Sequence, residues 1–206
     1  MRKEKDEIDE TAVWDDFRRG DKEAYELIYR KFSPLLYNYG YKITASREIT
    51  QDCIQELFIT LLVNRAKLGK TDSIKFYLYK SLRRSLMRAL KSSNRYVDGA
   101  VVPEDQFNVV FSCEYELIQE QISAERSAHL QKALDNLPPR QKEVIFLRFY
   151  ENLSFEQISA VMGIEQSSVY KIIYKAIHNL QDKLLMEYAI VLVQLHAVIG
   201  VAIERQ

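Results

Sequence analysis

The chain has 206 residues, 47% of them hydrophobic and 28% charged, which is enough for one large hydrophobic core or two small ones. Lysine plus arginine and aspartate plus glutamate both number 29, so the net charge identifies no class of partner and only the distribution of charge is informative. Cys53 and Cys113 fit no metal-ligand or redox spacing and the three histidines form no cluster with them, so we expect a reduced cytoplasmic protein with no metal and no cofactor. The charged residues 1–10 argue against a secretory signal.

Residues 13–91 carry apolar side chains at helical spacing, which predicts several amphipathic helices packed together. Asp21 is the expected N-cap of one of them, and we expect that helix to end before Pro34. A later helix is expected to begin after Asp72 or Ser73 and to run through the segment IKFYLYKSLRRSLMRALK.

The middle of the chain differs in character from both of its neighbours. Residues 92–116 contain Gly99, Pro103 and no sustained period, which is typical of a flexible linker. Residues 64–91 hold nine basic side chains and one acidic one, whereas residues 98–129 hold seven acidic side chains and one arginine. The sequence therefore predicts an all-α protein, in which two helical domains of different charge are joined by a flexible linker.

The second domain shows the signals of a helix-turn-helix. Pro138 ends one helix and Pro139 suits the first position of the next. Ser154 is a good N-cap, and Gln157 can complete a capping box with it. That helix must stop and reverse at Gly163, where only glycine adopts a left-handed backbone without strain. A short turn of this kind makes two helices cross steeply, as in DNA-binding domains.

The helix after Gly163 has two distinct faces. Its apolar face is expected in the core and contains Val169, Ile172, Ile173, Ala176, Ile177 and Leu180. The opposite face has no acidic residue and contains Ser167, Lys171, Tyr174, Lys175 and His178. Such a face suits the major groove of DNA, although taken alone it equally suits a solvated surface. The basic segment KFYLYKSLRRSLMRALK, with its interleaved aromatics, could hold phosphates and stack on unpaired bases.

Four motifs in order resemble one family, the RNA polymerase sigma factors of the sigma-70 family, in their compact extracytoplasmic-function (ECF) group. The motifs are DKEAYELIYRKF, DCIQELF, IKFYLYKSLRRSLMRALK, and the stretch from Leu137 to Ile177, LPPRQKEVIFLRFYENLSFEQISAVMGIEQSSVYKIIYKAI. The resemblance covers roughly residues 21–184. It implies a region 2 domain over residues 1–91, a linker over 92–116, a region 4 helix-turn-helix domain over 117–185 and an apolar tail over 186–206.

The resemblance also implies roles for individual residues. It assigns contact with core RNA polymerase to Asp52, Gln55 and Glu56. The helical period agrees, because it leaves these three residues facing outward while Ile54, Leu57, Phe58 and Leu61 face the core. The resemblance assigns binding of the minus-10 phosphates to Lys80, Arg83, Arg84 and Arg88, beside a loop and helix that hold a flipped-out base. Tyr77 and Tyr79 are available for stacking or core packing. The minus-35 element is read by Arg148, Ser167, Ser168, Lys171, Tyr174 and Lys175.

The sequence departs from the family pattern at four positions. A tryptophan common near Tyr77 is absent, Arg84 replaces a usual asparagine, Ile172 replaces a frequent arginine, and Glu165 replaces a helix-capping serine. These changes leave the preferred promoter sequence open.

The expected function is to bind core RNA polymerase and promoter DNA, double-stranded and melted, without catalysis, under the control of an anti-sigma factor. Two alternatives remain: a helix-turn-helix regulator with an N-terminal sensor or dimerisation domain, and a purely structural interaction protein. Residues 188–203 carry no formal charge, but Gln194 and His196 interrupt this run of 16 residues, which is short for the roughly 20 that span a bilayer. We therefore expect no stable membrane insertion, and a terminal helix that packs on this protein or on an inhibitor.

Overall fold

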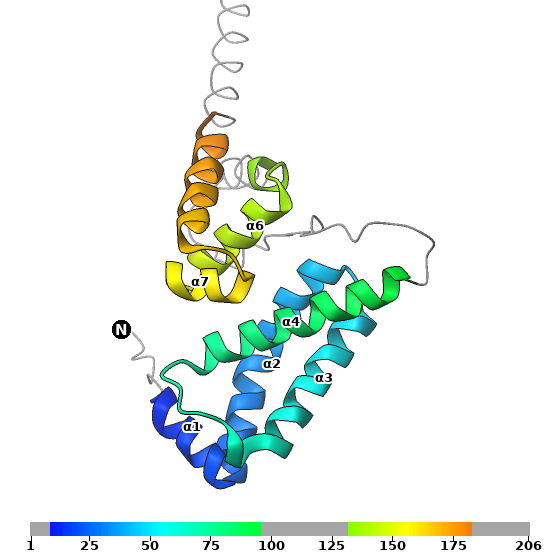
Figure 1. Cartoon of the computed structure of the whole chain (residues 1–206), viewed down its shortest axis with the longest axis vertical. Helices are drawn as coiled ribbons and strands as arrows, with labels where there is room; N and C mark the ends of the chain where they lie inside the picture. Colours follow the sequence, from blue (N-terminus) through cyan, green and yellow to red (C-terminus); the bar gives the residue numbers. More distant parts are fainter. Residues whose placement is uncertain (1–8, 96–131, 183–206) are drawn as a thin grey trace, which may run out of the picture. The chain divides into compact units, whose positions relative to one another are not determined.

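The computed structural model describes residues 9–95 and 132–182, and within these residues every regular element is helical, as predicted. The chain divides into two compact units, which are considered separately below. Figure 1 shows the helices. The first unit contains α1 (Glu10–Arg19), α2 (Lys22–Thr44), α3 (Arg47–Asn64), the short 3-10 helix η1 (Arg65–Lys67) and α4 (Ile74–Arg95), and it also takes in residues 153–164.

Side-chain caps define where the first helices begin. Asp9 caps α1 by accepting hydrogen bonds from the backbone N–H groups of Thr11 and Ala12. Gly20, with a φ of 98°, ends α1 in the left-handed region that glycine adopts without strain. Asp21 then accepts a hydrogen bond of 3.0 Å from the N–H of Ala24, which confirms it as the N-cap of α2.

The expectation that this helix ends before Pro34 is wrong, because α2 continues through Pro34 to Thr44. A proline within a helix removes the hydrogen bond to the carbonyl four residues earlier, here that of Arg30. Both Pro34 and Arg30 are exposed, so water can satisfy that carbonyl. On the other side of the helix Phe32 and Leu36 are fully buried, and their packing holds the two halves of α2 in one line.

The core of the first unit lies where α2, α3 and α4 pack against one another (Figure 1). Gly40 of α2 allows the closest approach, since a Cβ added there would lie 2.8 Å from Cγ2 of Thr50 in α3. Thr50 is itself fully buried and held in place by its hydroxyl, which lies 2.7 Å from the carbonyl of Ser46 and 2.8 Å from Oγ1 of Thr44. The helices therefore meet through backbone as well as side chains at this point.

Residues 68–73 connect η1 to α4. Ser73 accepts a hydrogen bond from the N–H of Phe76, which confirms it as the cap where α4 begins. Of the two tyrosines considered for stacking, Tyr79 is fully buried in the core and Tyr77 is half-buried. The described part of the predicted linker, residues 92–95, is the end of α4.

The predicted helix-turn-helix is present in the second part of the chain. Pro139 is the first residue of α6 (Pro139–Ile145), which continues into a π-helical turn, Phe146–Tyr150. Ser154 and Gln157 form the predicted capping box at the start of α7 (Phe155–Met162). Gly163 ends α7 with a φ of 67°, and residues 166–182 form the next helix. The predicted apolar tail, residues 186–206, lies outside the described residues.

Candidate nucleic-acid interface

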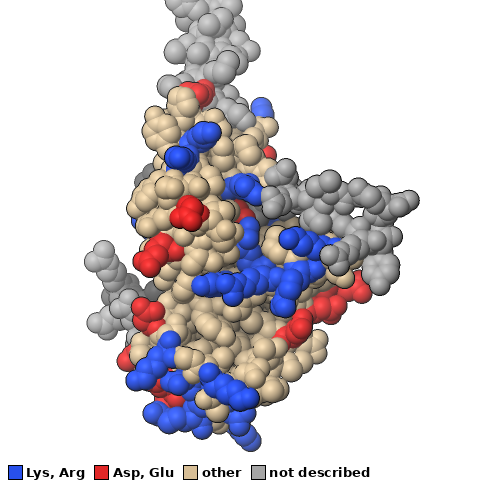
Figure 2. Space-filling model, viewed as in Figure 1, with Lys and Arg blue, Asp and Glu red and all other residues tan. Residues whose placement is uncertain are grey.

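Helix α4 carries all four basic side chains that the sequence assigns to the minus-10 element. Lys80, Arg84 and Arg88 recur every fourth residue, so they lie along one side of the helix. Arg84 and Arg88 are exposed, whereas Lys80 and Arg83 are half-buried. Figure 2 shows Lys and Arg gathered over this helix on the visible face. The arrangement matches a row of phosphates, where each neutralised phosphate releases bound counterions.

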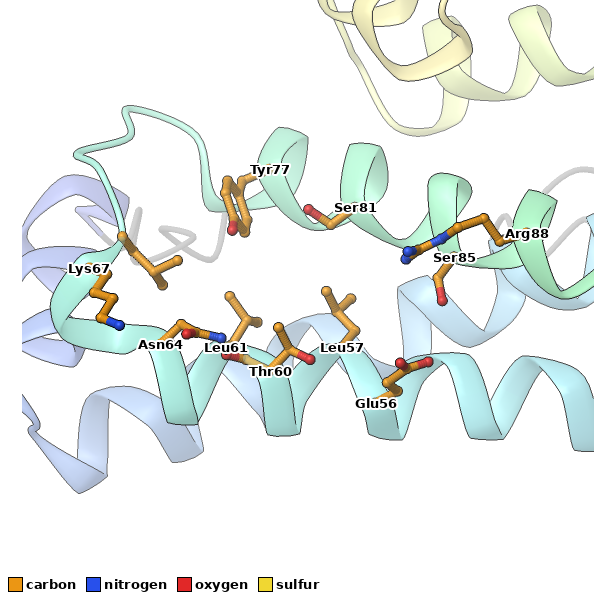
Figure 3. Close-up of a pocket in the computed structure, with 11 residues that line it drawn as sticks. Glu56, Leu57, Thr60, Leu61, Asn64, Lys67, Tyr77, Ser81, Ser85 and Arg88 are labelled. Carbon is orange, nitrogen blue, oxygen red and sulfur yellow. Dashed lines mark hydrogen bonds between the residues drawn. The ribbon is translucent and has the colours of Figure 1, made fainter.

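A groove between α3 and α4 opens beside this row (Figure 3). We call it the α3/α4 groove; it has a volume of about 400 Å³. Its apolar lining comes from Leu57 and Leu61 of α3, which point toward α4, and from Leu68 of the connecting loop. Its polar lining comes from Glu56, Thr60, Asn64, Lys67, Tyr77, Ser81, Ser85 and Arg88.

The two ends of the α3/α4 groove differ chemically from its middle. Lys67 and the Tyr77 ring lie at one end, and Arg88 and Glu56 lie at the other, with hydroxyl groups between them (Figure 3). An apolar wall with an aromatic ring accepts the flat face of a base, hydroxyl groups can meet its polar edge, and a cation at each end suits the phosphates on either side. The groove is therefore of the size and chemistry to take one nucleotide.

Cys53 is a free, buried cysteine of α3, and its environment favours the protonated thiol. Burial raises the pKa of the Cys53 thiol, and the carboxylates of Glu56 and Asp52 raise it further. A hydrogen bond with Ser85 and the charge of Arg88 act in the opposite direction but do not reverse the shift. Cys53 is therefore a packing residue of the core, without the character of a nucleophile.

The three predicted polymerase-binding residues are all exposed on α3, and their i, i+3, i+4 spacing places them on one side of the helix, with a groove on either flank. Asp52 and Gln55 line a second groove, between α2 and α3, which we call the α2/α3 groove. Glu56 instead lines the α3/α4 groove together with Arg88. Helix α3 thus presents two chemically different edges to its surroundings.

The α2/α3 groove is rich in aromatic side chains, and its tyrosines were not predicted as site residues. Tyr25, Tyr29 and Tyr37 of α2 line it together with Phe58 and Ile59 of α3. Tyr29 is 48% exposed and Ile59 is 53% exposed, and the Tyr29 ring packs on the edge of Phe58 with centroids 4.8 Å apart. Exposed aromatic and aliphatic groups rimmed by Asp52 and Gln55 are typical of a protein-binding surface. The spacing of tyrosines by four along α2 was the available signal.

In the helix over residues 166–182, the predicted DNA-facing residues lie on the surface. Ser167, Lys171, Tyr174 and Lys175 are exposed, and Ser168 is half-buried. The opposite face is buried at Val169, Ile173 and Ala176. Ile177, expected in the core, is instead 40% exposed. It lies two turns beyond Val169, where the helical period has rotated it toward the edge of the buried face.

The surface of this helix is also aromatic. Tyr174 is 74% exposed and stacks on His178, whose Nε2 lies 3.4 Å from a carboxylate oxygen of Asp182. Tyr170 is 50% exposed. Arg148 is half-buried in the π-helical turn Phe146–Tyr150, on the segment that precedes α7.

Within residues 9–95 and 132–182, no helix is both long and apolar enough to cross a membrane. The same residues contain no group of three or more His, Cys, Asp or Glu side chains that could hold a metal ion.

Comparison with known proteins connects these features to one family. Residues 28–96 match the model of Sigma-70 region 2, and residues 133–182 match Sigma-70, region 4. The two matches together take in more than half of the 206 residues. The two matched regions define a transcription initiation factor that binds promoter DNA. The chain belongs to the sigma-70 family of RNA polymerase sigma factors, and within it to the ECF group.

Individual relatives agree with this assignment. The chain is 26% identical over 184 residues to the ECF RNA polymerase sigma factor SigE of Mycolicibacterium smegmatis, an alignment that covers 87% of this chain and 69% of the relative. It is 24% identical over 151 residues to the RNA polymerase sigma factor SigV of Bacillus subtilis, covering 73% and 85% of the two chains.

Solved structures show the same fold. The sigma factor RpoE of Bartonella quintana, crystallised with the anti-sigma factor NepR, is similar with a TM-score of 0.56 and 18% identity, over 79% of this chain and 97% of that one. CnrH, in complex with the cytosolic domain of CnrY, gives a TM-score of 0.55 at 15% identity, over 84% and 96%. The alternative of a helix-turn-helix regulator is not favoured, because the region 2 match occupies the bundle that a sensor domain would require.

Proposed function

We propose that each part of this sigma factor has a separate contact in the initiation complex. The α2/α3 groove docks on core RNA polymerase, the helix over residues 166–182 enters the major groove of the minus-35 element, and the α3/α4 groove captures one unpaired base of the minus-10 element. The single observation that carries the proposal is the α3/α4 groove itself, which joins a site of nucleotide size to a row of basic side chains.

Base capture explains how promoter melting becomes favourable. A base can occupy the α3/α4 groove only when it has left the DNA stack, so binding there stabilises the melted state over the duplex. Lys80, Arg83, Arg84 and Arg88 hold the adjoining phosphates. Tyr77 at one end of the groove supplies an aromatic ring on which the base can stack.

Polymerase binding falls to the aromatic surface and its polar rim. Tyr29 and Ile59 supply apolar area that is exposed in the free chain, and Asp52 and Gln55 supply hydrogen-bonding groups at the edge. Glu56, one turn after Asp52 on the same side of α3, adds a second carboxylate to this contact. The polymerase performs the chemistry, and this chain acts as a non-catalytic subunit in the cytoplasm, where RNA polymerase is.

At the minus-35 element the helix-turn-helix supplies both positioning and readout. Arg148, Lys171 and Lys175 provide charge for phosphates, and Ser167, Ser168 and Tyr174 provide polar tips for base edges. Control by an anti-sigma factor is part of the proposal, supported by the similar fold of RpoE, which was crystallised with the anti-sigma factor NepR.

Run-off transcription with sigma-free RNA polymerase and a library of random promoters tests the function directly. The wild-type chain is expected to create specific transcription starts. In the same assay, Ser81→Phe fills the α3/α4 groove, and we expect at least a fivefold loss of open complexes, because stacking of one base contributes about 1–3 kcal/mol. Ser92→Phe places the same side chain on an exposed position of α4 outside the groove and serves as the matched control. Equal effects of the two variants would contradict base capture.

The docking surface is tested by comparing two exposed tyrosines of α2. Tyr29 is 48% exposed and lines the α2/α3 groove, whereas Tyr41 is 42% exposed and does not line it. Tyr29→Ala should weaken binding to core polymerase by about 1–3 kcal/mol, since buried aromatic anchors dominate interfaces, and Tyr41→Ala should not. Binding is measured by fluorescence anisotropy of labelled chain titrated with core enzyme.

A further inference from the structure

Helix α1 lies before residue 28, where the match to region 2 begins, and the function proposed above gives it no task. Three of its side chains, Glu10, Trp14 and Arg18, are spaced by four residues and therefore lie on one side of the helix. All three reach the same segment of the chain, the connection over residues 68–74 that leads into α4.

The contacts are hydrogen bonds to the backbone of that segment. Trp14 Nε1 donates to the carbonyl of Gly69 at 2.8 Å, and Arg18 Nε donates to the carbonyl of Leu68 at 2.7 Å. The N–H of Ile74, at the start of α4, donates to Glu10 Oε2 at 2.9 Å. Loops are usually mobile because their backbone groups bond to water, so three bonds from one rigid helix remove much of that freedom.

This connection forms part of the α3/α4 groove. Leu68 contributes to its apolar lining. Tyr77, at the same end of the groove, packs on the fully buried Trp14 with ring centroids 5.1 Å apart. Trp14 therefore supports both the loop and the ring on that side, although it lines neither the groove nor the basic row.

We propose that Glu10, Trp14 and Arg18 form a clamp, the α1 clamp, that fixes the loop wall of the α3/α4 groove and thereby sets how selectively the groove takes its base. The inference rests on the proposed base capture. These three are positioning residues, because they act through Leu68 and Tyr77 and not on the DNA. A wall held in one place before binding costs less to order when the base arrives, and it discriminates better against bases of the wrong shape.

The experiment measures base discrimination by the holoenzyme. The probes are the tightest-binding oligonucleotide selected from a random single-stranded pool and the same oligonucleotide with one abasic position; their affinity ratio reports capture of the base alone. Arg18→Ala should lower this ratio about three- to tenfold, as expected for one lost hydrogen bond to a positioned group. Arg19→Ala removes a neighbouring arginine that pairs with Asp16 of the same helix, and it should leave the ratio unchanged.

Glu10 provides an internal rescue. Glu10→Ala removes the acceptor of the Ile74 N–H and should lower the ratio as Arg18→Ala does, whereas Glu10→Gln keeps a carbonyl oxygen at that place and should restore it. Affinity for core polymerase should be the same in all variants. Hydrogen exchange of the free chain provides a second readout: the amides of residues 69–74 should exchange faster in Arg18→Ala and Glu10→Ala while those of α2 and α3 do not.

The outcomes separate the clamp from base capture. If Ser81→Phe abolishes the discrimination while Arg18→Ala and Glu10→Ala retain it, the clamp is overturned and the base site stands. If Ser81→Phe leaves the ratio at its wild-type value, the groove takes no base and both proposals fail. If the clamp variants lose discrimination only in proportion to a general loss of folding, seen as faster exchange throughout α2 and α3, the side chains are merely structural and the clamp is again overturned.

Discussion

Replacing Gly40 with alanine probes the closest contact in the first unit. The added Cβ would lie 2.8 Å from Cγ2 of Thr50, 3.5 Å from Cδ1 of Leu86 and 3.8 Å from Cδ2 of Leu82. The two leucine contacts are ordinary van der Waals distances, so the strain falls on Thr50. That side chain is β-branched, and turning it away would break its hydrogen bonds to Ser46 and Thr44.

Two opposing terms decide the magnitude. Alanine is favoured over glycine by about 1 kcal/mol in a helix interior. Forcing an extra methyl group into a packed core costs about 1–3 kcal/mol. With a mid-range steric cost of about 2 kcal/mol, Gly40→Ala should lower the free energy of unfolding by about 1 kcal/mol.

A second substitution tests the cause. Thr50→Ser removes Cγ2 but keeps the hydroxyl, so in that background Gly40→Ala no longer meets the methyl group and should stabilise by about 1 kcal/mol. The effect of one substitution thus changes sign, a coupling of about 2 kcal/mol. Unfolding in urea is followed by the fluorescence of Trp14, which is the one tryptophan of the chain and lies fully buried in the first unit. An equal effect of Gly40→Ala in both backgrounds would refute the packing argument.

Three further measurements follow from the structure. In a Cys113→Ser chain, where Cys53 is the one remaining thiol, burial and the raised pKa should make maleimide labelling slow until urea unfolds the protein; rapid native labelling would contradict this. Ser154→Ala removes the capping box and should destabilise the helix-turn-helix by about 1 kcal/mol in urea unfolding followed by circular dichroism, with Ser159→Ala as a control that keeps the cap. Burial lowers the pKa of Lys42, so between that value and the higher pKa of an unfolded lysine the unfolded state binds more protons and stability rises with pH; Lys42→Met should abolish that rise in unfolding curves recorded across this window.

The features that the sequence predicted best are those that local backbone geometry requires, namely helix caps and tight turns. Gly163 has the left-handed conformation that the turn requires, and Ser154 and Asp21 accept the hydrogen bonds that a helix start leaves open. Such requirements are local, so a few neighbouring residues reveal them. The alternation of the buried Val169 and the exposed Lys171 followed from the helical period in the same way.

Features that depend on distant parts of the chain were not predictable. Pro34 ends no helix, because packing of Phe32 and Leu36 outweighs the local preference of proline. The α1 clamp joins residues 50 to 64 positions apart, and no local pattern marks such pairs. The two grooves that flank α3 depend on how α4 and α2 pack beside it, and that packing is seen only in the assembled bundle.

In the proposed function, helix α3 separates the groove that docks on polymerase from the groove that takes the unpaired base. Thermodynamic reciprocity then constrains the whole initiation step. If docking on the polymerase raises the affinity of this chain for the base by some factor, binding of the base must raise its affinity for the polymerase by the same factor. A promoter that fills the groove well would therefore delay release of this subunit, so the strength of opening and the lifetime of association should rise together from one promoter to the next.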